Sequence, residues 1–268
     1  MPELLGKVAV ITGAVGLLGR AHCAAFLRAG ATVIATDLDH DACERFAESL
    51  AAATEGSTLG WGADVTESAS LERLREATLD RFGRIDVLLN NAALNDTFDE
   101  TSGPASSKFE NYPLDLFRLA MDVNVTGTFL ACQIFGVAMA ARGGGSIINV
   151  ASTYGLVAPD QSLYRRPDGS QTFFKSPSYV ASKGAVVAFT KFLAAYWGAR
   201  NVRVNCLCPG GVFADQEAYF VSSYSERTPL GRMADAGEIA QAAVFLASDA
   251  SSYMTGSNLV VDGGWTAW

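Results

Sequence analysis

Tyr179 and Lys183 are the residues best suited to acid–base chemistry, and they stand four positions apart in the run SPSYVASKGAVVAFTKF. A free tyrosine has a pKa of about 10, which makes its phenol a poor acid or base at neutral pH. Residues four apart on a helix share one face, and an ammonium group near a phenolate lowers the tyrosine pKa. The spacing therefore predicts a phenol that exchanges a proton with a substrate oxygen. Tyr154 is a rival phenol, but no lysine follows it four residues later.

Tyrosine–lysine pairs at this spacing are common by chance, so the interpretation depends on what stands upstream. Ser152 follows a predicted strand, and a glycine-rich turn, TGAVGLLG, runs from Thr12 to Gly19. Such a turn brings backbone N–H groups against a pyrophosphate, where a Cβ would block the approach, and the next helix adds partial positive charge. The turn lies in the first strand-to-helix connection, where doubly wound folds bind dinucleotides. A plain structural turn is the alternative.

Asp37 ends the second predicted strand, 18 residues after Gly19. A carboxylate at this place can accept hydrogen bonds from the hydroxyls of an adenosine ribose, and it would repel a 2′-phosphate. Because neither Thr36 nor Leu38 is basic, the sequence favours NAD over NADP, although Arg20 is close enough in sequence to argue for NADP. A solvated aspartate at a strand end is the alternative interpretation.

Three segments, at residues 94–112, 159–177 and 212–227, are expected to form the substrate side of the site. The middle one is polar and locally basic in an acidic protein, whereas a steroid or lipid pocket would be apolar. We hypothesise that Arg165 or Arg166 binds a carboxylate or phosphate of a sugar-like substrate, with a solvated surface loop as the alternative. The candidate substrate contacts are Ser152, Tyr154, Tyr179, Arg165 and Arg166.

The elements that must position these residues alternate between short apolar strands and helices. Strands are expected at 7–12, 31–36, near 64, and at 86–90, 146–151, 202–208 and 258–261; the later helices are expected at 123–142, 178–199 and 236–247. This alternation predicts right-handed crossovers, and therefore a Rossmann-type, doubly wound parallel sheet with helices on both faces. No linker divides the chain, so residues 1–268 are expected to form a single α/β domain.

The composition narrows the range of partners. The chain has 268 residues and a formal net charge of −8, which argues against nucleic acid or an anionic membrane as a partner. The five cysteines are odd in number and scattered, so neither a disulfide framework nor a metal site is expected. The N-terminus is unlike a secretory signal and the apolar runs are short for a membrane span. We therefore expect a cytoplasmic protein with a small-molecule substrate.

These motifs together resemble those of the short-chain dehydrogenases/reductases over essentially the whole chain. TGAVGLLG is similar to the family's TGxxxGxG turn, Asn90-Asn91-Ala92-Ala93 to its NNAG motif, and Arg203-Val204-Asn205 with Cys208-Pro209-Gly210 to the segment lining the nicotinamide. The resemblance implies an oxidoreductase that transfers a hydride between NAD(H) and a secondary alcohol or ketone. Its catalytic residues would be Asn124, Ser152, Tyr179 and Lys183. Its cofactor contacts would be Gly13, Val15, Gly16, Leu17, Leu18, Asp37, Asp64, Val65, Asn91, Ala92, Ala93, Tyr179, Lys183, Pro209, Gly210 and Val212.

The resemblance also implies a role for each catalytic residue. Ser152 would hydrogen-bond the substrate oxygen, and Tyr179 would exchange the proton. Lys183 would also hold the nicotinamide ribose, and Asn124 is similar to the residue that holds a proton-relay water. Asp64 is similar to the aspartate that contacts the adenine.

The sequence departs from the family pattern in four places. Leu17 stands where the family has a glycine, with Gly16 one place earlier, and the NNAG motif ends in Ala93. Ala214 replaces a threonine that helps to hold the carboxamide. The gap from Ser152 to the catalytic tyrosine is 27 residues (179 − 152), longer than is usual, and the extra residues fall at 159–177.

The loops suggest a branch of the family and an assembly. The stretch TYGLVAPD and the long insertion are similar to a bacterial branch associated with sugar and surface-glycan metabolism, including flagellin-modification oxidoreductases. Family members associate through the two long central helices, so a homodimer or homotetramer is expected. The C-terminal segment 260–268 could pack across a second interface; alternatively, Trp265 and Trp268 cover the chain's own substrate pocket.

Other functions remain open on the sequence. A nucleotide-sugar epimerase or dehydratase also uses a tyrosine–lysine pair with tightly bound NAD, but it gives no net NADH. A catalytically silent dinucleotide-binding protein is a second alternative, against which the retention of all four catalytic residues argues. A purely structural subunit has no specific feature in its favour.

Overall fold

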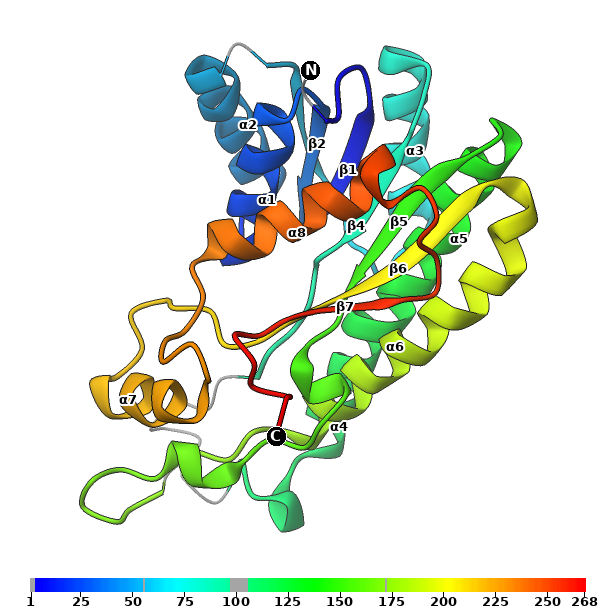
Figure 1. The fold of residues 1–268 in the computed structure, drawn as a ribbon. Coiled ribbons are helices and arrows are strands. Elements are labelled where there is room, and N and C mark those ends of the chain that lie inside the picture. Colours follow the sequence, from blue (N-terminus) through cyan, green and yellow to red (C-terminus); the bar gives the residue numbers. More distant parts are fainter. Residues whose placement is uncertain (1–2, 55, 97–105, 172) are drawn as a thin grey trace.

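Seven parallel strands form one sheet in the order β3-β2-β1-β4-β5-β6-β7 (Figure 1). The strands are β1 (Val8–Thr12), β2 (Thr32–Asp37), β3 (Thr58–Gly62), β4 (Val87–Asn90), β5 (Gly145–Val150), β6 (Val202–Pro209) and β7 (Asn258–Val261). This computed structural model describes residues 3–54, 56–96, 106–171 and 173–268. The strand order reverses between β1 and β4, and the predicted doubly wound parallel sheet is confirmed.

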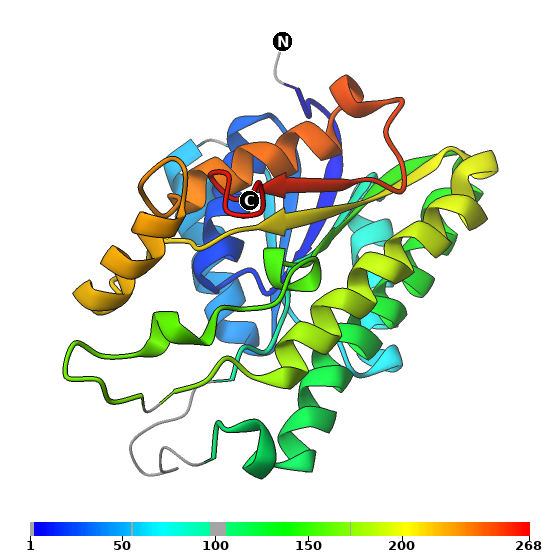
Figure 2. The same cartoon turned by 60° about the horizontal axis from the view of Figure 1, so that its bottom comes forward.

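Helices cover both faces of the sheet (Figures 1 and 2). One face carries α1 (Leu17–Arg28), α2 (His40–Thr54) and α8 (Ala236–Ala247); the other carries α3 (Ser68–Phe82), α5 (Gly127–Ala141) and α6 (Pro177–Trp197). Neighbouring residues of β1 serve opposite cores, since Ile11 packs with Phe26 on the first face and Val10 packs with Phe135 on the second. A strand buried on both faces explains why its sequence is apolar without alternation.

The helical segment before β5 is longer than predicted. The sequence indicated a start at Val123, but the segment begins with α4 (Leu114–Met121), passes through a π-helical turn at Asp122–Thr126 and continues as α5. Pro113 is the N-cap residue of α4, where its missing N–H costs the helix nothing. A π-helical turn fits an extra residue into a helix and is frequent at functional sites. Here that turn holds Asn124.

The same segment, Leu114–Ala141, is long and apolar enough to cross a membrane by composition alone. Half of its most apolar window is buried inside the fold. Ala131, Phe135 and Met139 are fully buried and belong to the core shared with the sheet. Packing thus accounts for the buried half of this apolar window.

The remaining elements lie close to their predicted positions. α8 and β7 have the predicted bounds, and α6 begins one residue early. The segment 212–227 contains α7 (Ala218–Arg227), and 159–177 contains a 3₁₀ turn, Gln161–Tyr164, which contacts α7. Of the segment 94–112, residues 97–105 lie outside the described residues.

Candidate active site

A cavity of about 670 Å³ lies where the carboxyl ends of four central strands meet. Its wall includes Leu17 after β1, Asn91 after β4, Ser152 after β5 and Gly210 after β6. Because parallel strands end at the same edge, their connections converge where the strand order reverses. The insertion at 159–177 and α7 supply the opposite wall.

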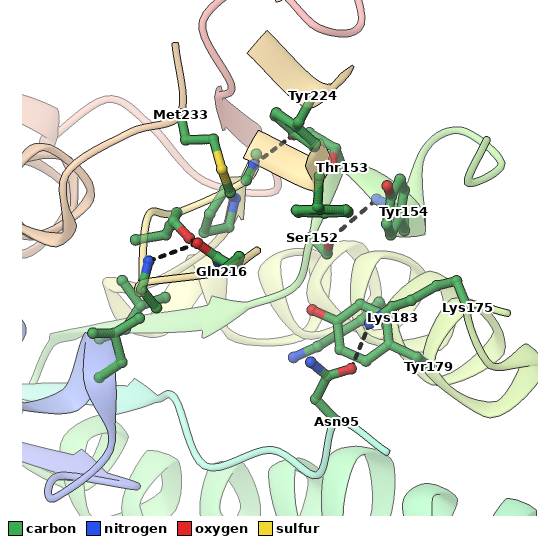
Figure 3. A pocket seen from close by; sticks show the side chains of 18 of the residues that line it. Asn95, Ser152, Thr153, Tyr154, Lys175, Tyr179, Lys183, Gln216, Tyr224 and Met233 are labelled. Carbon is green, nitrogen blue, oxygen red and sulfur yellow. Dashed lines mark hydrogen bonds between the residues drawn. The ribbon is translucent and has the colours of Figure 1, made fainter. Parts of the chain in front are cut away.

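Tyr179 lies in the first turn of α6, which has Pro177 as its first residue. Figure 3 shows its hydroxyl directed toward Ser152. Burial raises the pKa of Tyr179, and a hydrogen bond from Ser152 opposes that rise. The spacing predicted a lowered pKa, and for the chain alone that prediction is wrong, because loss of water around the phenolate outweighs the hydrogen bond from Ser152.

Ser152 is oriented by the backbone that follows β5. Its Oγ accepts a hydrogen bond from the backbone N–H of Tyr154 at 3.1 Å, as the N-cap of a short 3₁₀ turn. With the oxygen used in this way, the hydroxyl proton is available to an oxygen atom in the cavity. Tyr154, the rival phenol, directs its hydroxyl away from Ser152 (Figure 3), and burial raises the pKa of Tyr154 strongly.

Lys183 lies one turn further along α6 and is only 4% exposed. Its Nζ donates a hydrogen bond to the carbonyl oxygen of Val150 at 2.8 Å and lies 5.7 Å from the centroid of the Tyr179 ring. Burial lowers the pKa of Lys183 to about 8. The pair thus lies on one face of α6, and the anchoring carbonyl belongs to the last residue of β5.

Asn124 is held within the π-helical turn by hydrogen bonds to two other segments. Its Oδ1 accepts from the backbone N–H of Leu94 at 2.7 Å, and its Nδ2 donates to the Leu94 carbonyl at 3.0 Å and to Ser182 Oγ at 3.0 Å. The side chain is 1% exposed. Asn124 therefore ties the segment after β4 to the first turns of α6.

Two glycines of the TGAVGLLG turn are required by its geometry. Gly13 has φ +64°, and a Cβ there would lie 2.8 Å from Ala92 Cα; a Cβ on Gly19 would lie 2.0 Å from the Gly13 carbonyl oxygen. Gly16, the displaced glycine, is the N-cap residue of α1 with φ −74°, and a Cβ there would come no closer than 3.4 Å to Gly13. Leu17 simply begins the helix, and its half-exposed side chain lines the cavity.

The start of α1 fits the pyrophosphate of a dinucleotide. No side chain caps this helix, so its first N–H groups have no side-chain partner at the edge lined by Leu17 and Leu18. Asp37 Oδ2 accepts from the backbone N–H of Val15 at 3.2 Å, and Oδ1 accepts from that of Leu38 at 2.9 Å. The uncapped start of α1 and the Asp37 carboxylate therefore lie side by side at the glycine turn.

The Asn-Asn-Ala-Ala segment closes onto the same turn. Asn91 Nδ2 donates to the carbonyl oxygens of Thr12 at 3.0 Å and Gly13 at 3.1 Å. Thr12 Oγ1 accepts from the backbone N–H of Ala92 at 3.0 Å. Ala93, in place of the family's glycine, lines the cavity.

Asp64 and Val65 follow β3, beyond the cavity. Asp64 Oδ1 accepts from the backbone N–H and from Oγ1 of Thr66, at 2.8 and 2.7 Å. Val65 packs against Gly127, and a Cβ on Gly127 would lie 2.7 Å from Val65 Cγ2. Both residues thus have structural partners of their own, which hold this segment next to the start of α5.

Pro209, the last residue of β6, lines the cavity, as do Gly210 and Val212 after it. The backbone N–H of Gly210 donates to the Val261 carbonyl at 2.9 Å, which ties this segment to β7. Ala214, which stands in place of a threonine, donates its backbone N–H to Gln216 Oε1 at 2.8 Å. Gln216 lines the cavity and is a polar residue that the sequence analysis did not select.

The structure separates the two arginines of the substrate hypothesis. Arg166 lines the cavity, and its guanidinium lies 3.4 Å from the carboxylate of Glu217. Arg165 is exposed and is not among the described residues that line the cavity. Position therefore favours Arg166, whose charge already has a partner.

Lys175 and Asn95 also belong to the cavity wall, although no motif marked them. Lys175 Nζ lies 3.9 Å from the centroid of the Tyr179 ring and donates a hydrogen bond to Asn95 Oδ1 (Figure 3). Their meeting depends on the path of two loops, so the only signal in the sequence was the basic character of the insertion before α6.

The C-terminal tryptophans play different parts. Trp265 is buried and stacks on Tyr224, with ring centroids 4.3 Å apart, and Tyr224 lines the cavity. Trp268 is 82% exposed. Trp265 thus supports the wall of the chain's own pocket, whereas Trp268 does not.

Comparison with known proteins decides the family. Residues 7–165 match the family model described as short chain dehydrogenase, and residues 168–266 match the one described as Enoyl-(Acyl carrier protein) reductase. The chain belongs to the short-chain dehydrogenase family. The predicted resemblance is confirmed, and the protein is an oxidoreductase of CH–OH groups that uses a nicotinamide dinucleotide.

This short-chain dehydrogenase is similar to several characterised enzymes. It is 37% identical to D-threitol dehydrogenase of Mycolicibacterium smegmatis, covering 98% of this chain and 94% of the relative. It is also 37% identical to galactitol 2-dehydrogenase (L-tagatose-forming) of Cereibacter sphaeroides, covering 99% and 97%. A solved structure of gluconate 5-dehydrogenase from Burkholderia cenocepacia J2315, in complex with NADP and tartrate, has a TM-score of 0.86 and 29% identity, covering 99% of this chain and 97% of that one.

Proposed function

We propose that this short-chain dehydrogenase transfers a hydride between NAD(H) and a secondary alcohol of a polyol or another polar, sugar-like molecule. The observation that carries the proposal is the meeting of Ser152, Tyr179 and Lys183 at a cavity beside the uncapped start of α1. When bound, the nicotinamide supplies the hydride acceptor or donor.

Residues of the chain bind the substrate oxygen and exchange the proton. Ser152 hydrogen-bonds the oxygen of the reacting alcohol, and the Tyr179 phenolate takes its proton during oxidation and returns it during reduction. Lys183 stabilises that phenolate and binds the nicotinamide ribose. Asn124 acts by holding the first turns of α6 against the segment after β4.

Asp37 supports NAD rather than NADP. Its carboxylate lies beside the glycine turn and is placed to repel a 2′-phosphate. In wild type, kcat/KM with NAD is expected to exceed that with NADP. In Asp37→Ser, the ratio of the two should fall by at least about 10-fold. An unchanged ratio would reject this role for Asp37 and leave Arg20 as the residue to test.

The cavity wall supports a hydroxylated substrate. Asn95, Asp96, Lys175 and Gln216 place amide, carboxylate and ammonium groups around it, and two relatives are named for threitol and galactitol. A carboxylated sugar is a more specific alternative. Arg166 in the cavity wall favours it, and the tartrate in the gluconate 5-dehydrogenase structure is a precedent for a carboxylated ligand.

A substrate screen tests the whole proposal. Polyols, aldonates, uronates, sugar phosphates and nucleotide sugars are each mixed with NAD or NADP, and NADH or NADPH formation is followed by absorbance. We expect net reduction with polyols or aldonates. A product that forms without net change in NADH would identify an epimerase instead, and cofactor binding without any product would identify a silent binding protein.

We further propose that the enzyme assembles with second copies of itself through α5 and α6. Phe189, Phe192 and Tyr196 form a stacked row along α6, and Phe192 and Tyr196 are 61% and 67% exposed. An exposed aromatic row along a long helix suits a symmetric interface. The five cysteines are all free and buried, which supports a reducing, cytoplasmic setting.

A further inference from the structure

The insertion at 159–177 brings a second ammonium group to the catalytic phenol. Lys175 Nζ lies 3.9 Å from the centroid of the Tyr179 ring, closer than Lys183 Nζ at 5.7 Å. Figure 3 shows both lysines converging on this ring. The family's spacing rule accounts for Lys183 alone, and nothing in it places a cation on the ring face from the preceding loop.

Hydrogen bonds hold both the backbone and the ammonium group of Lys175 in place. Its backbone N–H donates to Gln161 Oε1 at 2.8 Å, and its carbonyl accepts from Gln161 Nε2 at 3.1 Å. Gln171 Nε2 donates to the Gln161 carbonyl at 2.7 Å, which joins the two sides of the insertion. At the other end, the ammonium donates to Asn95 Oδ1. The loop therefore delivers this ammonium to a defined position.

The charge of Lys175 has no close counter-ion. Within the described residues, no carboxylate lies within 4 Å of its Nζ. Asp96 favours the charged form from further away, and its own carboxylate accepts hydrogen bonds from Tyr112 and Ser178. Burial and Lys183 together lower the pKa of Lys175 to about 8. At neutral pH the ammonium is thus mostly charged, and besides the neutral Asn95 oxygen it contacts the face of the Tyr179 ring.

We propose that Lys175 is a second cation for the catalytic tyrosine, which stabilises the Tyr179 phenolate from the face of its ring. A cation over a neutral phenol interacts with the ring quadrupole. When the phenol loses its proton, the ring carries a full negative charge, so the attraction to the same cation becomes larger. Lys175 therefore favours the phenolate and offsets the burial that opposes it. The inference rests on the proposed function, in which Tyr179 is the acid–base group.

The other groups that face Tyr179 do not replace this cation. Ser152 donates a hydrogen bond to the phenol oxygen, Lys183 contributes the first ammonium, and Tyr154 and Tyr164 are phenols that burial keeps neutral, so they supply no cation. Because ionisation of Lys175 and Tyr179 is coupled, phenolate formation also raises the pKa of the lysine.

The first arm of the test measures Tyr179 ionisation directly, without cofactor or substrate. Protein labelled with carbon-13 at the tyrosine Cζ is titrated, and Tyr179→Phe identifies the resonance. We expect Lys175→Met to raise the Tyr179 midpoint by about 1 unit or more, with Lys175→Arg close to wild type. The same midpoint in Lys175→Met and wild type, to within about 0.3 unit, would overturn the proposal.

Two further variants keep this arm decisive. Asn95→Ala leaves the charge of Lys175 but removes its hydrogen-bond acceptor, so an intermediate rise in the Tyr179 midpoint is expected. If circular dichroism shows that Lys175→Met does not fold, Asn95→Ala is used for the test instead. Lys191→Met removes an exposed lysine of α6 and should not move the midpoint. An equal shift in Lys191→Met and Lys175→Met would mean that net charge, not the ring contact, is responsible, and would also overturn the proposal.

The second arm uses the enzyme with NAD and its best alcohol. In Lys175→Met, the rise of log kcat with pH is expected about 1 unit or more higher, with an unchanged plateau. A raised KM with an unmoved pH profile would show that Lys175 binds substrate instead, and would reject the proposal. If wild type oxidises alcohols but neither the Tyr179 midpoint nor the pH profile shifts in Lys175→Met, only the role of Lys175 is rejected. If the Tyr179 midpoint shifts but the protein has no dehydrogenase activity, only the proposed function is rejected.

Discussion

Lys183 is a charge kept where water cannot reach it, and that arrangement has a cost in stability. Burial lowers the pKa of Lys183 from 10.5 to about 8, while its ammonium donates a single hydrogen bond within the described residues, to the Val150 carbonyl. Because its pKa is lower in the folded chain, the unfolded chain binds more protons between pH 8 and 10.5, and stability rises with pH across that window. Below pH 8 the full cost is present.

Lys183→Met should therefore stabilise the protein while abolishing its activity. We expect the free energy of unfolding to rise by about 1–3 kcal/mol at pH 7, and by much less near pH 11, where the lysine is neutral in both states. Urea unfolding at both pH values measures the difference, with the exposed Lys191→Met as the matched control. A gain of equal size at both pH values would show that apolar packing, not removal of a buried charge, is responsible.

At the scale of the elements, the glycine turn separates two kinds of glycine. Gly13 and Gly19 leave no room for a Cβ, whereas Gly16 has an ordinary φ, and a Cβ there would make only an ordinary contact with the Gly13 carbonyl oxygen. Gly13→Ala and Gly19→Ala are expected to lower stability by more than about 2 kcal/mol and to abolish NAD binding. Gly16→Ala should stay within about 1 kcal/mol of wild type. Thermal unfolding and NAD titration test this, and a Gly16→Ala variant as damaged as Gly13→Ala would contradict the geometry.

The bounds of a helix or strand could be predicted where the local sequence pattern determines them, but not where long-range packing does. α8 and β7 were predicted with their bounds, because an apolar period and turn residues mark both ends. The start of α4 and the π-helical turn were missed, since a wider turn gives no periodic signal. Likewise Tyr179, Lys183 and Ser152 carry motif spacing, but Lys175 and Asn95 meet only through the path of two loops.

At the scale of the whole molecule, the aromatic row on α6 predicts association. Phe192→Glu combined with Tyr196→Glu is expected to shift the sedimentation coefficient from an oligomer to the monomer, because two charges would be buried in the interface. Tyr253→Glu, at a fully exposed aromatic residue elsewhere, is the control. A wild-type protein that sediments as a monomer at micromolar concentration, or a double variant that still associates like wild type, would contradict an interface here.

The acid–base role of Tyr179 is the central claim, and hydride transfer in a single turnover tests it most directly. NADH formation is followed by stopped flow with saturating NAD and the best alcohol from the screen, in wild type and in Tyr179→Phe, after fluorescence titration has shown that both bind NAD. The rate in Tyr179→Phe is expected to be lower by about 10²–10⁴-fold. A rate within about 3-fold of wild type would contradict the account, because the proton would then be leaving by another path.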